Sequence, residues 1–91
     1  MKKILTMENL EMCFRLAKAR KQNYIGIKVS VPNSKEDEVI INPNANFDNK
    51  LEYYKKAYND NLTLKSFNQI RITGFTYGNS YGEIENDLIT G

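Results

Sequence analysis

The feature that most constrains the fold is a change of hydrophobic period within the first third of the chain. Apolar residues between Met7 and Ala17 recur at steps of three and four residues, which is the spacing of one face of an α-helix. Apolar residues from 25 to 31 then alternate with small or polar ones, which is the period of a half-buried strand. Such a helix and strand can bury their apolar surfaces by packing on one another, so the sequence predicts an α+β fold. The residues that carry the two patterns are Met7, Leu10, Phe14 and Ala17, followed by Ile25, Ile27, Val29 and Val31.

The later patterns extend this to the order α-β-β-α-β-α in a single domain of residues 1–91. A hairpin followed by a helical crossover favours a three-stranded antiparallel sheet of strand order 2-1-3, with helices on at least one face. Alternation predicts that Arg71 and Phe75 lie on the same side of the third strand. The expected later elements are a return strand over 38–42, a helix over 48–58 with Asp48 as its cap, a strand over 67–75, and a helix over 80–88 that turns Tyr81, Ile84 and Leu88 inward.

Composition excludes most kinds of enzyme. The chain has 91 residues, no histidine and one cysteine. The absence of histidine removes the commonest general base and the commonest metal ligand. Cys13 lies on the core-facing side of the first helix, where it behaves as a small apolar side chain. We therefore expect a non-enzymatic protein with no catalytic residues, no metal and no cofactor.

Charge and targeting signals indicate the class of partner and the compartment. Net charge is only +2, but residues 1–30 carry seven Lys or Arg against two Glu, so that third of the chain is at +5. This basic segment could meet an anionic partner, or its lysines could simply be solvated. The sequence has no secretory signal pattern and no apolar run long enough to cross a bilayer. It predicts a cytoplasmic protein with no membrane contact.

The segment 74–82 is the strongest candidate for a ligand site. Its glycines stand at positions 74, 78 and 82 and would let a ligand approach the backbone closely, while its tyrosines could stack on a base. A cation from a neighbouring strand position would hold a phosphate or carboxylate. The alternative is a tight strand-to-helix turn with a structural role only. The predicted ligand-binding residues are Lys28, Arg71, Tyr77, Asn79, Ser80 and Tyr81.

Two further groups of residues are candidates for protein contact. Tyr53 and Lys56 lie outside the apolar face of the second helix and have the side-chain types that recognition surfaces favour. Met12 and Leu16 form an apolar patch opposite the main stripe of the first helix. That patch needs cover, either from another element of the same chain or from a second subunit. We expect the protein to form a homo-oligomer, a dimer or a higher assembly.

The chain resembles small accessory proteins of phages and prophages of low-GC Firmicutes. The resemblance rests on its size, its bias towards Asn, Lys and Ile, its compact α+β layout, and the stretch IRITGFTYG at 70–78. It implies a counter-defence role, most directly as a sponge that sequesters a nucleotide-derived immune signal. The alternative is an anti-CRISPR protein that binds a Cas effector, or another host defence protein, directly. A small nucleic-acid-binding regulator that uses the basic first helix is the third hypothesis.

Overall fold

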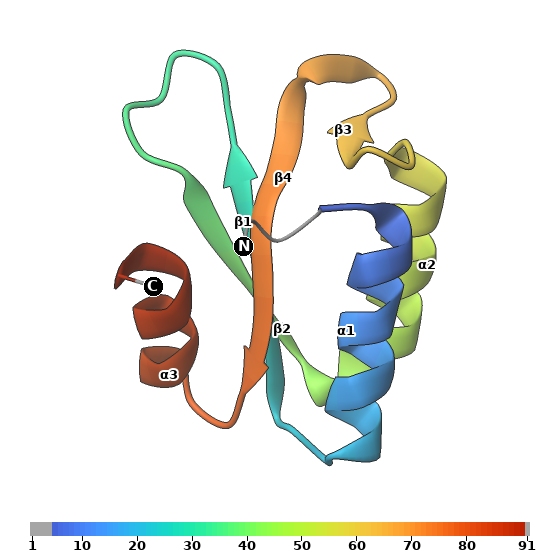
Figure 1. Ribbon diagram of the computed structural model, residues 1–91, viewed down its shortest axis with the longest axis vertical. Coiled ribbons are helices and arrows are strands. Elements are labelled where there is room, and N and C mark those ends of the chain that lie inside the picture. The colour runs from blue at the N-terminus through green and yellow to red at the C-terminus, as the bar shows by residue number, and fades with distance from the viewer. Residues whose placement is uncertain (1–4, 91) are drawn as a thin grey trace.

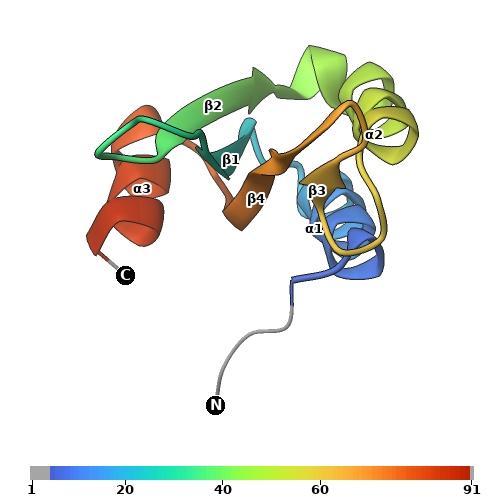
Figure 2. The ribbon, with the colours of Figure 1, turned by 90° about the horizontal axis from the view of Figure 1, so that it is seen from above.

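An antiparallel β-sheet lies between two helical layers of unequal size (Figure 1). The structure is a computed structural model that describes residues 5–90, with side chains described for 5–88. Two helices cover one face of the sheet and a short third helix covers the other, as the view from above shows (Figure 2). The elements are α1 Met7–Ala19, β1 Tyr24–Ser30, β2 Glu38–Pro43, the 3₁₀ turn η1 Asn44–Asn46, α2 Phe47–Ala57, β3 Thr63–Leu64, β4 Phe67–Gly78, α3 Tyr81–Glu85 and the π turn η2 Asn86–Thr90.

The predicted α+β class and antiparallel sheet are confirmed, but the predicted number of strands is wrong. The sheet has four strands in the order β2-β1-β4-β3. The strand expected as the third is β4, and it lies beside β1 as predicted. The additional strand β3 pairs with β4 only at Thr63 and Leu64. A strand of two residues has no hydrophobic period, so no pattern in the sequence could reveal it.

Helix α1 forms for the reasons that its sequence suggests. The Thr6 side chain accepts a hydrogen bond from the Asn9 backbone N–H at 3.2 Å, and so caps the first turn. Beyond the helix, Lys21 adopts a positive φ of 54°, which is the left-handed geometry common after a helix end. The inner stripe packs on β1, and the Phe14 ring meets the Phe47 ring edge-on at 5.8 Å between centroids. This side of the sheet contains most of the core.

Helix α2 begins one residue earlier than predicted. Asp48 is not its cap, because the chain enters the helix directly from the turn η1. The buried Phe47 is the first helical residue, and burial of its ring sets the start. Asp48 lies within the first turn, and its carboxylate accepts a hydrogen bond from Lys18 Nζ at 2.8 Å, which ties α1 to α2.

A bulge in β4 changes which side chains share a face. Lys28 pairs with Gly74 while the next residue, Val29, pairs with Ile72, so Thr73 is an extra residue in β4. Directly paired residues point to the same side of a sheet. The apolar side chains before and after the bulge therefore both face α1 and α2. Arg71 pairs with Ser30 and lies on the opposite face from Phe75, so the prediction that these two share a side was wrong.

The α3 layer rests on a face that is partly bare of side chains. A Cβ atom at Gly26 would lie 2.1 Å from Ile84 Cγ2 and 3.1 Å from Leu88 Cδ1, so glycine is what lets α3 and η2 sit on the sheet. Ile84 and Leu88 are buried, as predicted. Tyr81 was expected to face inward as well, but it is 57% exposed. Its ring lies against the edge of Tyr24, with 4.9 Å between centroids.

Candidate binding surface

The residues predicted to bind a ligand are divided between the two ends of β4. Arg71 is exposed and pairs with Ser30 on one side and with Thr63 on the other. Tyr77 pairs with Ile25 near the opposite end of the strand. The two residues are six positions apart on an extended strand, which is roughly 20 Å. The structure therefore does not bring Arg71 to the glycine- and tyrosine-rich segment.

The middle of that segment forms the bonds of a strand-to-helix turn. Ser80 Oγ accepts a hydrogen bond from the Glu83 backbone N–H at 3.2 Å, and Glu83 Oε2 in turn accepts one from the Asn79 N–H at 2.7 Å. This reciprocal arrangement is close to a capping box, although the second donor lies one residue before the cap. Asn79 Oδ1 accepts a third bond from the Asn23 N–H at 3.2 Å, which fixes the turn to the start of β1. These contacts fit the structural role that was the alternative for this segment.

Lys28, another predicted ligand-binding residue, forms a contact with the α3 layer instead. Its Nζ donates a hydrogen bond to the Leu88 carbonyl oxygen at 3.0 Å, at the end of the last helical segment. A cation near the C-terminal end of a helix is favoured by the helix dipole and can bond its last carbonyl oxygens. Lys28, Gly74, Asp87 and Leu88 line a hollow of about 380 Å³ on this face. None of the other predicted ligand-binding residues lines this hollow.

Tyr77 lies at the other side of β4, next to α1. Its hydroxyl accepts a hydrogen bond from Arg20 Nη1 at 2.6 Å. Its ring borders an open hollow of about 360 Å³ between α1 and β4, with Met12 and Leu16 on the opposite wall. Tyr77 and the two apolar residues belong to different predicted sites, whereas in the structure they line the same hollow.

The outer face of α1 is the largest concentration of exposed apolar side chains on the helical layer. Met12 is 49% exposed and Leu16 is 37% exposed, so the elements among residues 5–88 cover each side chain only in part. Glu8 precedes Met12 by four residues and Arg20 follows Leu16 by four. Residues four apart lie on one side of a helix. We call this row, Glu8, Met12, Leu16 and Arg20, the α1 stripe.

The charges at the two ends of the α1 stripe differ from the other charges of this helix. Glu11 Oε2 accepts a hydrogen bond from Lys55 Nζ at 2.9 Å, which lowers the pKa of that carboxyl, and its other oxygen lies 3.4 Å from Arg15. Lys18 pairs with Asp48, as described above. Within residues 5–88, no oppositely charged side chain lies within 4 Å of Glu8 or Arg20. Among the described residues, the stripe thus has an apolar centre, a carboxylate without a counterion at one end and a guanidinium without a counterion at the other.

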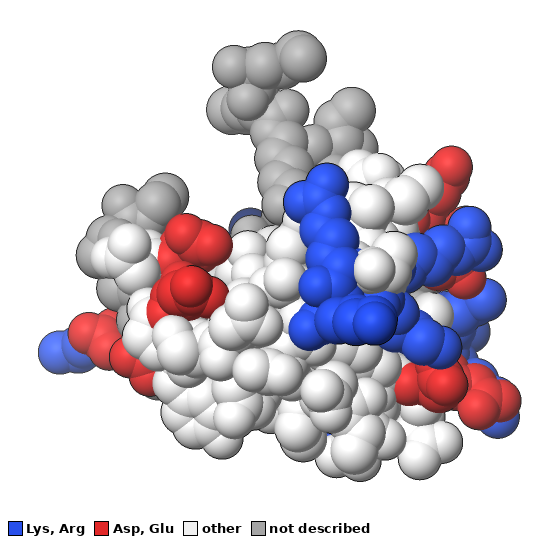
Figure 3. Space-filling model, turned by 90° about the horizontal axis from the view of Figure 1, so that it is seen from below, with Lys and Arg blue, Asp and Glu red and all other residues white. Residues whose placement is uncertain are grey.

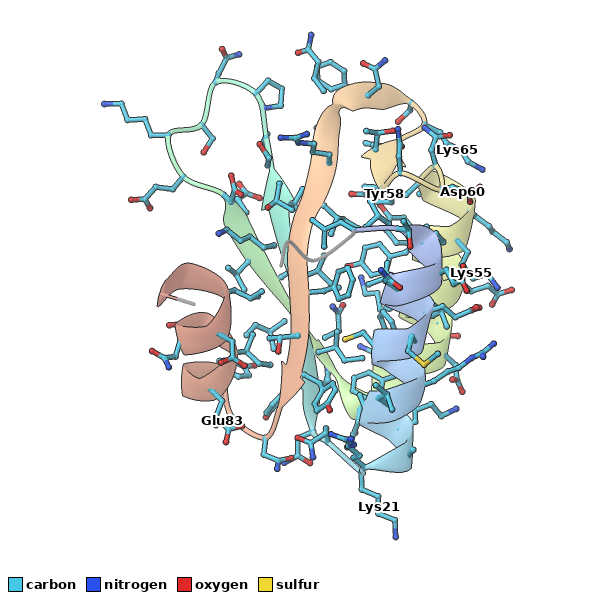
Figure 4. All side chains as sticks on the ribbon, viewed as in Figure 1. Lys21, Lys55, Tyr58, Asp60, Lys65 and Glu83 are labelled. Carbon is cyan, nitrogen blue, oxygen red and sulfur yellow. The ribbon has the colours of Figure 1, made fainter. Side chains whose placement is uncertain are left out.

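The view from below shows how these charges are distributed. Lys and Arg side chains gather on the side of the helical pair (Figure 3). Lys21 extends away from the body of the molecule at the C-terminal end of α1 (Figure 4). Among the described basic residues of the first third of the chain, Lys18, Arg20 and Lys21 lie at this end of α1, whereas Lys28 lies on the α3 face.

Tyr53 and Lys56 lie on the outer surface of α2, as predicted. Tyr53 is 50% exposed, and its ring contacts the edges of two buried rings, with centroids 5.2 Å from Tyr54 and 6.5 Å from Tyr58. Lys50 Nζ lies 5.7 Å from the Tyr53 ring centroid. Lys56 Nζ is 3.7 Å from a Glu52 oxygen. Tyr53 is therefore an exposed aromatic side chain that its neighbours hold in place.

Glu8 and Arg20 are the two surface residues that sequence reasoning missed. The signal was present, because both continue the four-residue spacing of Met12 and Leu16. Neither residue stood out, because an acid at the start of a helix and a base at its end are ordinary companions of the helix dipole.

Comparison of the chain with protein-family models, with curated proteins and with solved structures found no match. Among the described residues, no helix has the length and apolar character that crossing a bilayer requires. Their Cys, Asp and Glu side chains form no group of three or more that could hold a metal ion.

Proposed function

We propose that this chain is a non-enzymatic protein-binding module whose contact surface is the outer face of α1. The observation that carries the proposal is the exposed pair Met12 and Leu16 beside the open hollow that Tyr77 borders. Burial of apolar side chains in contact with a shallow hollow is how protein interfaces gain most of their affinity. A single core of this size, without histidine, leaves little room for catalysis and suits recognition.

Site-specific photocrosslinking tests this function. A benzophenone amino acid placed at Met12 should crosslink to a protein when the chain is produced in cells and irradiated. The same amino acid at Lys35, which is exposed in the loop between β1 and β2, is the matched control and should give little product. Absence of any crosslinked product from position 12 would contradict the proposal, whatever the identity of the expected partner.

The counter-defence role that the phage resemblance implies belongs to a second surface. We propose that Tyr53 and Lys56 on α2 contact a host defence protein. Both side chains are exposed on that helix, the Tyr53 ring packs against Tyr54, and tyrosine is a residue type that interfaces favour as an anchor. Tyr53→Ser should then abolish inhibition of a defence system that the wild-type chain inhibits, with Lys35→Ser as the control. A panel of effectors, type II Cas proteins among them, that the wild-type chain neither binds nor inhibits would argue against this role.

Sequestration of a nucleotide-like ligand remains a second candidate function, now at a different place from the predicted one. The observation that favours it is the hollow beside Tyr77, whose volume of about 360 Å³ falls within the range of small-molecule sites. Arg20 stands at its edge and could meet an anionic group. Thermal-shift measurements with cyclic dinucleotides and cyclic ADP-ribose isomers test it, since a ligand at 100 times its Kd stabilises the folded state by about 2.7 kcal/mol. A melting temperature that none of them raises would exclude the candidate.

A further inference from the structure

The α1 stripe is complementary to itself. Its four residues are spaced evenly, with the acid at one end, the base at the other and the apolar pair between them. If two such stripes lie side by side in opposite directions, Met12 of one faces Leu16 of the other. The same register brings Glu8 opposite Arg20 at both ends. Each of the four residues therefore meets a side chain of suitable chemistry.

We infer that the occupant of the α1 face is a second copy of this chain, packed with its α1 antiparallel across the first and related to it by a twofold axis. The inference rests on the proposed function, because it names the partner of the surface proposed there. A contact about a twofold axis uses the same patch on both subunits, so that patch has to complement itself. An unrelated partner would not require an acid at one end of the α1 stripe and a base at the other, because its own surface need not match the stripe.

The other charged residues of α1 support this choice of occupant. Glu11, Arg15 and Lys18 form ion pairs within the chain, which accounts for them without a partner. Glu8 and Arg20 have no counterion among the described residues. They lie at equal distances from the midpoint between Met12 and Leu16, which is where the twofold axis would pass. The two unneutralised charges are thus placed where a second copy would neutralise both.

Arg20 can serve both contacts. A guanidinium has five N–H donors, and Tyr77 occupies one of them. The bond to Tyr77 restrains the side chain at the end of the stripe, so less conformational entropy is lost when a carboxylate from the second copy binds. The hollow beside Tyr77 would then lie at the edge of the interface between the copies.

Charge reversal tests the register as well as the dimer. At about 200 µM, which is above the dissociation constants of small transient interfaces, light scattering should give twice the monomer mass of 10.5 kDa. Glu8→Arg and Arg20→Glu should each weaken the dimer about tenfold or more, since each places like charges opposite one another at both ends. The double variant should regain the dimer. An equimolar mixture of the two single variants should form a heterodimer, because one then carries two bases and the other two acids.

The controls separate a lost interface from a lost fold. Circular dichroism of each variant should match that of the wild-type chain. Lys35→Glu makes a charge change of the same size away from α1 and should leave the dimer intact. Met12→Glu places a charge in the apolar centre and should give a monomer that neither reversal restores.

Three results would overturn the inference. They are a monomeric wild-type chain at this concentration, a dimer that the single reversals do not weaken, and single variants that do not associate when mixed. The proposed function fails separately, in the photocrosslinking experiment. A product of twice the chain's own mass supports both, whereas a product only with another protein supports the function and overturns the inference.

Discussion

The two faces of the β-sheet are covered by layers that hold together in different ways. On the face of α1 and α2, large apolar side chains interlock, with Leu10, Phe14, Phe47 and Tyr54 among the most deeply buried. On the face of α3, the sheet instead offers glycine, and two apolar side chains from the last segment fill the space. The layer of α1 and α2 is therefore held by packing between large side chains. The α3 layer is held because Gly26 has no side chain and leaves room for Ile84 and Leu88.

The difference predicts unequal stability. Helix α3 has five residues, far fewer than the length at which an isolated helix holds its shape in water. It is retained by Ile84 and Leu88, by the Ser80 cap and by the Lys28 bond. We expect the α3 layer to open locally while the α1 and α2 layer and the sheet remain folded. Each of the following changes would break or sharpen this contrast.

The largest expected effect is in the first layer. Phe14→Ala should lower the free energy of unfolding by about 3–5 kcal/mol, because it leaves a cavity between Phe47 and Tyr54. Urea denaturation followed by circular dichroism measures the loss. Leu16→Ala, on the exposed side of the same helix, is the control and should cost less than about 1 kcal/mol at concentrations where the chain is a monomer. Equal losses at both positions would mean that the inner face of α1 is not the main source of stability.

The second effect concerns Tyr54 in the same layer. Burial raises the pKa of Tyr54 to about 12, from 10.0 for an unperturbed tyrosine. Its contribution to stability is fully present below pH 10 and is lost as pH rises towards about 12, because the unfolded chain ionises first. The loss amounts to about 2–3 kcal/mol in all. Burial also raises the pKa of Tyr58, so part of the slope belongs to that residue.

Denaturation series from pH 8 to pH 12 on the wild-type chain and on Tyr54→Phe would separate the two contributions. The variant should lose less stability across the alkaline range, because it retains only the share of Tyr58 and of the exposed groups. Identical slopes would show that Tyr54 ionises in the folded state as readily as in the unfolded chain.

The sequence predicted the first layer better than the second, for physical reasons. Helix α1 has a regular apolar spacing, and the side chain of Thr6 caps it in a way that depends on three neighbouring residues only. Ser80 caps the last helix through the same kind of local bond, since its hydroxyl accepts a hydrogen bond from the Glu83 N–H three residues later. Local chemistry of this kind can be read from a short stretch of chain.

Features that depend on distant parts of the chain could not be predicted in this way. The extra residue Thr73 moves Arg71 to the face opposite Phe75, and nothing in the alternation marks it. The alternation assigned Gly26 to the strand but gave no sign that Ile84, 58 positions later, would contact it. The candidate site was predicted least well. The bulge puts Arg71 and Tyr77 on opposite faces of β4, and their positions at opposite ends of the strand keep them roughly 20 Å apart.

The third effect belongs to the α3 layer. Gly26→Ala adds a Cβ atom within 2.1 Å of Ile84 Cγ2, and overpacking of this kind costs about 1–3 kcal/mol. The free energy of unfolding cannot fall by more than the free energy that holds α3 on the sheet. If the clash costs more than that, α3 detaches and the clash is relieved. Hydrogen exchange should show amides of α3 losing their protection before those of β1. Gly82→Ala is the matched control, since its nearest neighbour would be 4.0 Å away and the variant should be at least as stable as the wild-type chain.

A second substitution tests whether that contact is the cause. Ile84→Ala removes the clashing atom, so Gly26→Ala combined with it should cost less than the two single losses added together. Additive losses would mean that the alanine at position 26 acts through the strand and not through α3.

The smallest expected effect is the loss of one helix cap. Comparing the cap of α1 with the cap of α3 tests most directly whether the two helical layers differ in stability. Thr6→Ala and Ser80→Ala each remove one cap and should each cost about 1 kcal/mol. Their signatures in hydrogen exchange should differ, however. If α3 opens while α1 stays folded, Thr6→Ala destabilises the closed and the locally open state equally, so the amides of α3 should keep their protection and only those of α1 lose it. Ser80→Ala destabilises the closed state alone, so both helices should lose protection. If Thr6→Ala also lowered the protection of α3, the two layers would unfold as one unit.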